Sequence, residues 1–222
     1  LSVPEMAVSE VEAKRVLASN GIGVVREALV TDADSAVSNA AEMPGAVVMK
    51  IASPDIQHKT EIGGVLVGVE GDDAVRNGFD TLIARAKEHA PDASIDGVVV
   101  CEMVSGGVET VIGVNSDPTF GPVVMFGLGG IFVEVLKDVT IRLAPFGVDE
   151  AARMIREIKS FDVLTGARGG PAVDLDDPAE TLSRVSVFAA ENADTLDSLD
   201  INPYLSLPKG GCALDALIVP KG

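Results

Sequence analysis

Apolar positions in the first half of the chain recur at helical spacing in three places. The first is residues 10–20, which end at Gly21, a residue suited to a left-handed helix cap. The second is a short alanine-rich helix after residues 31–35, a segment with several residues suited to an N-cap. The third begins at Asp72 or Asp73, either of which we expect to cap it, and its apolar stripe consists of Val75, Phe79, Leu82, Ile83 and Ala86.

Short runs rich in β-branched residues predict the strands. Two lie in the first half of the chain, at residues 47–51 and 64–69. The middle of the chain has a series of such runs, at residues 98–102, 108–114, 122–126, 132–136 and 139–143. No helix of useful length separates them, so antiparallel pairing of neighbours is the expected connection. The chain then continues with two helices and two strands, at residues 148–159, 178–192, 196–201 and 213–219.

This order of elements differs from the regular strand–helix alternation of a doubly wound sheet. We therefore predict an α/β protein made of two α+β lobes, each with a mostly antiparallel sheet. Lobe one covers about residues 21–101, and lobe two covers about residues 102–222 together with the helix at residues 10–20. The two lobes are expected to meet near residues 101–109.

Composition and charge narrow the class of partners. The 222 residues include 34 Asp and Glu against 17 Lys and Arg, which gives a net charge of −17. This excess argues against a nucleic-acid surface, whose affinity comes from neutralising phosphates, and any anionic ligand needs a site that gathers scarce cations. No apolar run is long enough to cross a membrane. Cys101 and Cys212 have no metal-ligand spacing and are expected to be reduced core thiols of a cytoplasmic protein.

A glycine-rich segment, Gly127-Leu128-Gly129-Gly130, follows one of the predicted strands. The dinucleotide-binding fingerprint requires a third glycine where this chain has Phe132. The Gly-Lys-Ser or Gly-Lys-Thr tripeptide of a P-loop is also absent from the sequence. Two interpretations remain, a tight turn and a phosphate cradle, and the glycines alone favour the turn.

Several charged residues lie at strand ends or in loops. Lys50 follows an apolar run, where a charge is costly unless it extends to solvent or faces a cleft that holds phosphates. Glu102 and Glu109 bracket a glycine-containing connector, and they are either solvated or placed to hold the hydroxyl pair of a sugar. His58 lies in a polar loop beside Lys59, where a surface histidine is the simpler interpretation.

The last two predicted strands contain Asp200, Asn202 and Asp215. Strand alternation puts Asp200 and Asn202 on one face. Asp215 is predicted to lie inside an apolar strand, where its buried charge needs a compensating partner. Oxygen ligands from two adjacent strands suit Mg²⁺, which completes its shell with water and phosphate. The structural alternative is an Asx turn before Pro203.

Taken together, these segments resemble a known family. The motifs are Val47-Val48-Met49-Lys50-Ile51, Ser53-Pro54-Asp55-Ile56-Gln57-His58-Lys59, Gly63-Gly64-Val65, Glu102 with Glu109, Asp117-Pro118-Thr119-Phe120-Gly121-Pro122-Val123, Gly127-Leu128-Gly129-Gly130-Ile131-Phe132-Val133-Glu134, Arg142-Leu143-Ala144-Pro145, Gly166-Ala167-Arg168-Gly169, Asp200-Ile201-Asn202-Pro203 and Leu214-Asp215-Ala216. In this order they resemble the ATP-grasp (β-type) subunit or domain of NDP-forming acyl-CoA synthetases, of the acetate–CoA ligase (ADP-forming) type. The β chain of succinyl-CoA synthetase is a more distant relative. Two departures are mild: Glu61 stands where the family usually has Asp, and Tyr204 replaces an aliphatic residue.

The resemblance implies an ATP-grasp fold over residues 1–222, in which two lobes clamp ATP or ADP. It implies that Lys50 contacts the phosphates and that Glu102 leads the connector whose backbone at Met103 and Val104 meets the adenine. Glu109 corresponds to the carboxylate that binds the ribose. Each of these roles is an expectation from the family rather than from the spacing of the residues.

The resemblance also implies a metal site and a phosphorylated residue. Asn202 and Asp215 are the expected Mg²⁺ ligands, with Asp200 as a weaker third candidate. His58 resembles the family's second phosphorylatable histidine, which passes a phosphoryl group between the nucleotide and a histidine of a partner domain. An imidazole nitrogen suits this role because it is nucleophilic near neutral pH and forms a labile P–N bond.

The expected function is therefore that of an acid–thiol ligase component, incomplete without a CoA-binding, phosphohistidine-bearing α-type subunit or fused domains. The start of the chain, with its linker-like Pro4, favours a domain of a fused polypeptide over a separate subunit. One alternative is a regulatory nucleotide-sensing ATP-grasp domain fused to an acyltransferase, without turnover. Another is an ATP-grasp carboxylate–amine ligase, against which the histidine loop counts.

Overall fold

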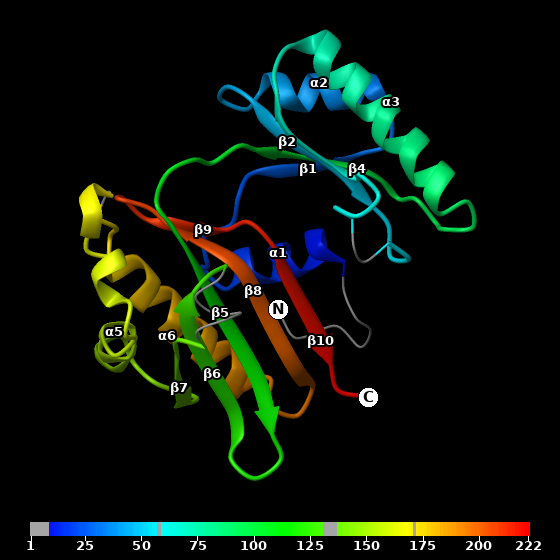
Figure 1. The fold of residues 1–222 in the computed structure, drawn as a ribbon. Helices are drawn as coiled ribbons and strands as arrows, with labels where there is room; N and C mark the ends of the chain where they lie inside the picture. The colour runs from blue at the N-terminus through cyan, green and yellow to red at the C-terminus, as the bar shows by residue number, and fades with distance from the viewer. Residues whose placement is uncertain (1–8, 57–58, 131–136, 171) are drawn as a thin grey trace. The chain divides into compact units, whose positions relative to one another are not determined.

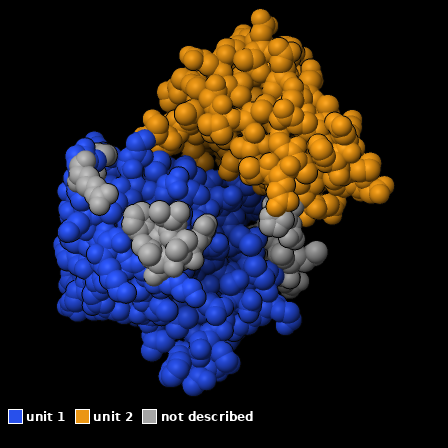
Figure 2. Space-filling view, in the orientation of Figure 1, with its two compact units in different colours: residues 1–24, 106–222 blue, residues 25–105 orange. Residues whose placement is uncertain are grey.

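The computed structural model describes residues 9–56, 59–130, 137–170 and 172–222. The chain forms two compact units, one of residues 25–105 and one of residues 1–24 and 106–222 (Figure 2). Two sequence predictions, His58 and a strand at residues 132–136, lie outside the described residues. Within the described ranges, no helix has the length and apolar character needed to span a bilayer.

The smaller unit is a four-stranded antiparallel sheet with two helices (Figure 1). Its elements are β1 (Glu27–Val30), α2 (Ala33–Ala41), β2 (Val47–Ala52), β3 (Val65–Val69), α3 (Asp72–His89) and β4 (Gly97–Glu102). The strand order is β1-β4-β2-β3, and α2 and α3 pack against the sheet. Buried and half-buried residues alternate along β2, so Val47, Met49 and Ile51 join the helices in one core.

Two details of this unit differ from the sequence predictions. The strand β1 was not predicted, because four residues are too few to show a period; its pairing with β4 creates it. The predicted aspartate cap of α3 is wrong, because Gly71 is the N-cap residue, with φ 87°, and no side chain caps the helix. Asp72 and Asp73 lie in the first turn instead, where their negative charges interact favourably with the helix dipole.

The larger unit contains the second antiparallel sheet, with strand order β10-β8-β5-β6-β7, and β9 pairs with β8 (Figure 1). Its strands are β5 (Val108–Asp117), β6 (Gly121–Leu128), β7 (Val139–Leu143), β8 (Leu196–Ser206), β9 (Gly211–Ala213) and β10 (Ala216–Pro220). Its helices are α1 (Glu10–Ser19), α5 (Val148–Arg156), α6 (Asp176–Glu191) and the short η1 (Phe161–Val163) and η2 (Ala167–Gly169). Residues of α1, α5 and α6 share one core with Ile112, Phe126 and Ile201 of the sheet. The helices therefore cover the sheet face to which these three side chains point.

The predicted C-terminal strand at residues 213–219 is broken into two. β9 pairs with Tyr204–Ser206 of β8, whereas β10 pairs with its earlier part, and Leu214 and Asp215 lie in the break. The strand that carries Asp200 and Asn202 is longer than predicted, because it continues past Pro203 to Ser206. The helix predicted at residues 148–159 ends earlier, at Arg156.

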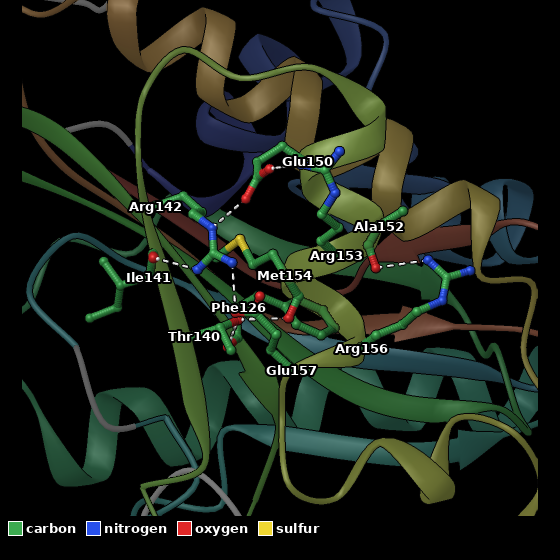
Figure 3. A network of polar contacts seen from close by, with 10 residues as sticks. All are labelled: Phe126, Thr140, Ile141, Arg142, Glu150, Ala152, Arg153, Met154, Arg156 and Glu157. Atoms are coloured by element: carbon green, nitrogen blue, oxygen red, sulfur yellow. Dashed lines mark hydrogen bonds and ion pairs between the residues drawn. The ribbon is translucent and has the colours of Figure 1, made fainter.

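The edge strand β7 is fastened to α5 by a group of ion pairs and hydrogen bonds (Figure 3). The Arg142 guanidinium lies 2.7 Å from Glu150 Oε1 and 2.6 Å from Glu157 Oε2. Arg153 also pairs with Glu150, at 2.6 Å. The Thr140 hydroxyl donates to the Met154 carbonyl at 3.0 Å. Arg142, a member of the family motifs, thus has a structural role in joining the strand to the helix.

Candidate functional site

Lys50 lies inside β2, on the sheet face opposite α2 and α3. Its neighbours Met49 and Ile51 are buried in the helix-covered core, and alternation turns Lys50 to the other face, where it is half-buried. It pairs with Val99 of β4 on one side and Val65 of β3 on the other. The pairing on both sides therefore fixes the backbone of Lys50, whose cationic side chain lies on the helix-free face of the sheet.

The connector between the two units begins at Glu102, the last residue of β4. The Glu102 amide donates to the Arg26 carbonyl at 2.9 Å, which extends the pairing with the segment before β1. Met103 is 38% exposed and Val104 is half-buried, and both lie beyond the end of the ladder. Their peptide groups follow a firmly held strand end, which is a suitable place for backbone recognition of a base.

Two hydrogen bonds hold the segment of residues 59–64, which follows the undescribed residues 57 and 58. The Gly64 amide donates to the Lys59 carbonyl at 2.7 Å, and a Cβ at Gly64 would lie 2.8 Å from that same oxygen. Arg85 of α3 donates to the Gly63 carbonyl at 2.8 Å. Sequence reasoning missed Arg85, because its place on a helix gave no sign of a contact with this loop. The turn after His58 is therefore fixed by a glycine and by a long-range hydrogen bond.

In the larger unit, Glu109 lies near the start of β5 and is exposed. Its carbonyl accepts a hydrogen bond from the Gly129 amide at 2.8 Å. A Cβ at Gly129 would lie 3.2 Å from the Glu109 Cβ, so the glycine allows the two backbones to approach closely. Because the Gly129 N–H is used in this way, the structure favours packing over a phosphate cradle at this glycine.

The structure brings Asp200, Asn202 and Asp215 to the same part of the larger sheet. Asp200 and Asn202 are exposed on β8, whereas the Ile201 between them is buried, so the two polar side chains share the helix-free face. The backbone N–H of Asn202 donates to the backbone carbonyl of Asp215 at 3.2 Å. Asp200 pairs with Leu217 of β10, two residues after Asp215. Asp200 and Asn202 share one strand face as predicted, but the prediction that Asp215 lies inside a strand is wrong, because the C-terminal strand is broken at Leu214 and Asp215.

Electrostatics link the two carboxylates of this group. Local desolvation raises the pKa of Asp200, and the negative charge of Asp215 raises it further. A cation between them would relieve this repulsion, and carboxylate and amide oxygens are the ligands that Mg²⁺ prefers. Within the described ranges, no three His, Cys, Asp or Glu side chains gather into a metal-holding group. The two carboxylates and Asn202 are oxygen donors of the kind that Mg²⁺ takes, and such an ion completes its shell with water and phosphate.

Comparisons with known proteins fit this arrangement. A model of the ATP-grasp domain matches residues 2–219 of the chain. The chain is 40% identical over 210 residues to acetate–CoA ligase [ADP-forming] I subunit beta of Pyrococcus furiosus, a match that covers 95% of this chain and 90% of that subunit. The chain belongs to the ATP-grasp domain family. The resemblance and the fold class predicted from the sequence are thereby confirmed.

ATP-grasp relatives of this chain also occur within longer proteins. The chain is 42% identical over 206 residues to 4-hydroxybutyrate–CoA ligase [ADP-forming] of Nitrosopumilus maritimus, with 92% of this chain but 29% of that protein covered. The relatives are thus ligase components, either as a β subunit or as part of a larger polypeptide.

Solved structures show the same ATP-grasp fold. The dinucleotide forming acetyl-coenzyme A synthetase 1 of Ca. Korarchaeum cryptofilum, in complex with coenzyme A, Ca-AMPCP and HgCl⁺, matches with a TM-score of 0.93 and 39% identity, covering 97% of this chain and 94% of that one. The same enzyme with coenzyme A and Mg-AMPPCP, its phosphohistidine segment pointing towards the nucleotide binding site, matches with a TM-score of 0.85 and 37% identity, covering 97% and 93%.

Proposed function

We propose that this chain is the ATP- or ADP-binding component of an ADP-forming acyl-CoA synthetase. The observation that carries the proposal is the group of Asp200, Asn202 and Asp215 on one sheet face, in a chain whose relative binds Mg-AMPPCP. Lys50 binds the nucleotide phosphates, and Glu109 binds the ribose hydroxyls. These two residues lie on helix-free or exposed positions of the two sheets, as such roles require.

Base recognition falls to the connector in this proposal. The backbone of Met103 and Val104 pairs with the adenine edge, and Glu102 leads into them from the end of β4. Support comes from the Glu102–Arg26 backbone hydrogen bond, which holds the start of the connector in place. Groups fixed before a ligand arrives lose less conformational freedom on binding, which favours affinity.

The metal site works together with the nucleotide. Asn202 and Asp215 present oxygen atoms to Mg²⁺, and Asp200 completes the set from the same strand as Asn202. When bound, the ion offsets the charge of the phosphates. The −17 net charge of the chain makes this compensation important, because the protein as a whole repels phosphoryl groups.

His58 performs the group transfer in this proposal. A His58 ring nitrogen attacks the γ-phosphorus of ATP, and an N–P bond forms as the bond from phosphorus to the bridging oxygen breaks and ADP leaves. The phosphoryl group then passes to a histidine of an α-type partner, and His58 regains its free nitrogen. The reverse sequence makes ATP. In a solved relative a phosphohistidine segment points towards the nucleotide binding site, which supports phosphoryl transfer between a nucleotide and a histidine in this kind of enzyme.

The partner of this chain is, in the same proposal, an α-type CoA-binding subunit or a set of fused domains, in a cytoplasmic enzyme. The named relatives include both a β subunit and longer ligases, which supports either arrangement. The regulatory alternative, a nucleotide sensor fused to an acyltransferase, is not favoured, because these relatives are ligases. Buried cysteine thiols such as Cys101 and Cys212 fit a reducing compartment.

Nucleotide affinity of two variants tests the site. Lys50→Ala should weaken ADP binding about tenfold or more while adenosine binding stays within twofold, because the lysine meets only phosphates. Glu109→Ala should weaken both ligands by a similar factor, because both contain the ribose. Isothermal titration calorimetry with ADP and adenosine measures each value.

Glu61→Ala serves as the matched control, since this glutamate has no proposed contact with nucleotide. It should leave both affinities within twofold of the parent. Equal ADP affinity in Lys50→Ala and the parent would remove Lys50 from the site. A parent chain that binds neither ADP nor ATP in the presence of Mg²⁺ would contradict the proposed function as a whole.

A further inference from the structure

Lys14 is a buried lysine on α1. The residue is 1% exposed and belongs to the side of α1 that also buries Val11, Ala13 and Leu17. A buried ammonium group is costly unless it is paired and hydrogen-bonded. A helix that needs only an apolar face would be more stable with a nonpolar residue here, so the retained charge calls for a specific explanation.

The Lys14 ammonium group contacts Glu10 and the backbone of Leu214. Its Nζ atom lies 3.0 Å from Glu10 Oε1, one helical turn earlier, and the Glu10 side chain is 10% exposed. Nζ also donates to the Leu214 carbonyl at 3.2 Å, a contact that joins residues 200 positions apart in the chain. The charge of Lys14 is thus compensated by Glu10, and one of its hydrogen bonds is spent on a backbone group next to Asp215.

Leu214 is the residue at which the C-terminal strand breaks. Because the break takes Leu214 and Asp215 out of the regular ladder, other groups must satisfy their backbone. The Leu214 amide donates to the Pro203 carbonyl at 3.0 Å, and the Asp215 carbonyl accepts from the Asn202 amide at 3.2 Å. The Leu214 carbonyl accepts a hydrogen bond from the Lys14 ammonium group. Lys14 reaches it from α1, which packs against β10.

We infer that Lys14 is a positioning residue for the metal site: it fixes the Leu214–Asp215 peptide so that the Asp215 carboxylate is directed to the nucleotide-bound Mg²⁺. This inference rests on the proposed function. Groups that orient a metal ligand typically change metal affinity by about 10–100-fold when removed. Lys14 acts on the ligand from the helix-covered side of the sheet, and Asn202 acts on it from the neighbouring strand.

Three variants of the full chain separate positioning from simple stability. Lys14→Met removes the donor and leaves the Glu10 carboxylate without its lysine. Glu10→Gln keeps the lysine and its bond to Leu214 but removes the opposite charge. The double variant, Glu10→Gln with Lys14→Met, removes both members of the ion pair, so its stability should recover relative to that of Lys14→Met.

The measurements are the affinity of Mn²⁺ for the ADP-bound chain, by electron paramagnetic resonance, and the thermal unfolding midpoint without metal. Lys14→Met and the double variant should both bind Mn²⁺ about tenfold more weakly. Glu10→Gln should bind it within about threefold of the parent while its unfolding midpoint falls by several degrees. Metal affinity should thus follow the Lys14 donor and not the stability of the protein.

Three outcomes would contradict the positioning role of Lys14. Parent-like Mn²⁺ affinity in the double variant would overturn the role of Lys14 and leave the proposed function intact. The same holds if Glu10→Gln loses as much affinity as Lys14→Met, because the effect would then follow stability. A parent chain that binds ADP but no Mn²⁺ would overturn the metal site of the proposed function, and the inference with it.

Discussion

Single side chains in this protein take their chemistry from the sheet face on which they lie. Lys50 and Asp200 both occupy positions whose neighbours along the strand are buried against helices, and alternation turns them to the helix-free face. A charge on that face keeps access to solvent or ligand without disturbing the core. Local desolvation raises the pKa of Asp200, and the nearby charge of Asp215 raises it further.

His58 carries the sharpest prediction at the residue scale. His58→Ala should abolish phosphoryl exchange with the α-type partner while ADP affinity stays within about threefold, because the histidine serves transfer and not ground-state binding. Incubation with the partner and labelled ATP, followed by peptide mapping, measures the exchange. The label on the parent should be lost in acid and kept in base, as expected for a P–N bond.

His89, on the last turn of α3, is the matched control, because His89→Ala removes the other histidine of the chain. This variant should exchange phosphoryl groups at the parental rate. If the partner's histidine is labelled at the normal rate in His58→Ala, transfer from ATP is direct and the shuttle is wrong.

At the scale of elements, α5 and β7 are held together by charge as well as by apolar packing. The Arg142 side chain is 25% exposed and bridges Glu150 and Glu157 from the edge strand (Figure 3). The hydrogen bond from Arg142 lowers the pKa of Glu150 below its usual value. The Arg142 guanidinium also donates to the Ile141 carbonyl at 3.0 Å, so it satisfies one backbone group of β7.

Arg142→Met should lower the thermal unfolding midpoint at pH 7 by about 2–4 °C, because β7 loses its ionic link to α5. Since the pKa of Glu150 is lowered from 4.5, this stabilisation is complete above that value and is lost as the pH falls. The difference between variant and parent should therefore shrink in acid. Calorimetric scans at pH 7 and pH 3.5 measure both midpoints.

Arg156→Met is the control for this element. Arg156 donates to the Ala152 carbonyl of its own helix at 2.9 Å and is exposed. Its replacement should move the midpoint by less than about 1 °C. Equal shifts in the two variants would show that the Arg142 contacts add nothing beyond an ordinary surface arginine.

On the scale of the whole molecule, the residues proposed to bind the nucleotide belong to both compact units. Lys50 and Glu102 come from residues 25–105, whereas Glu109 and Asp215 come from the unit that includes residues 106–222 (Figure 2). Each unit has its own sheet and its own core. The proposed function thus requires both units, and neither alone carries the complete set of residues.

This division leads to a prediction for the full chain. It should bind Mg-ADP or Mg-ATP but form no acyl-CoA on its own, because it has no proposed residue for CoA or the acyl group. Calorimetry measures nucleotide binding, and a thiol-consumption assay with acetate, CoA and ATP measures synthesis with and without an α-type partner. Thioester formation by the chain alone would contradict the assignment as a component.

The local elements and the family follow from patterns within the sequence. The spacing of apolar residues over a few neighbouring positions predicts strands β2 and β5 and helices α1 and α6. The same kind of local pattern predicts the alternation that exposes Asp200 and Asn202. The ordered motifs identified the ATP-grasp family without any knowledge of contacts, which the comparisons confirm.

Features that depend on residues distant in the chain become visible only in the folded protein. Four such features have no local signal in the sequence. They are the break at Leu214–Asp215, the strand β1, the contact of Gly129 with Glu109 and the burial of Lys14. Each exists because a partner far along the chain supplies or accepts a hydrogen bond, as Pro203 and Lys14 do for Leu214. A backbone group must be satisfied wherever the fold places it, and the sequence around that group does not reveal which distant residue will satisfy it.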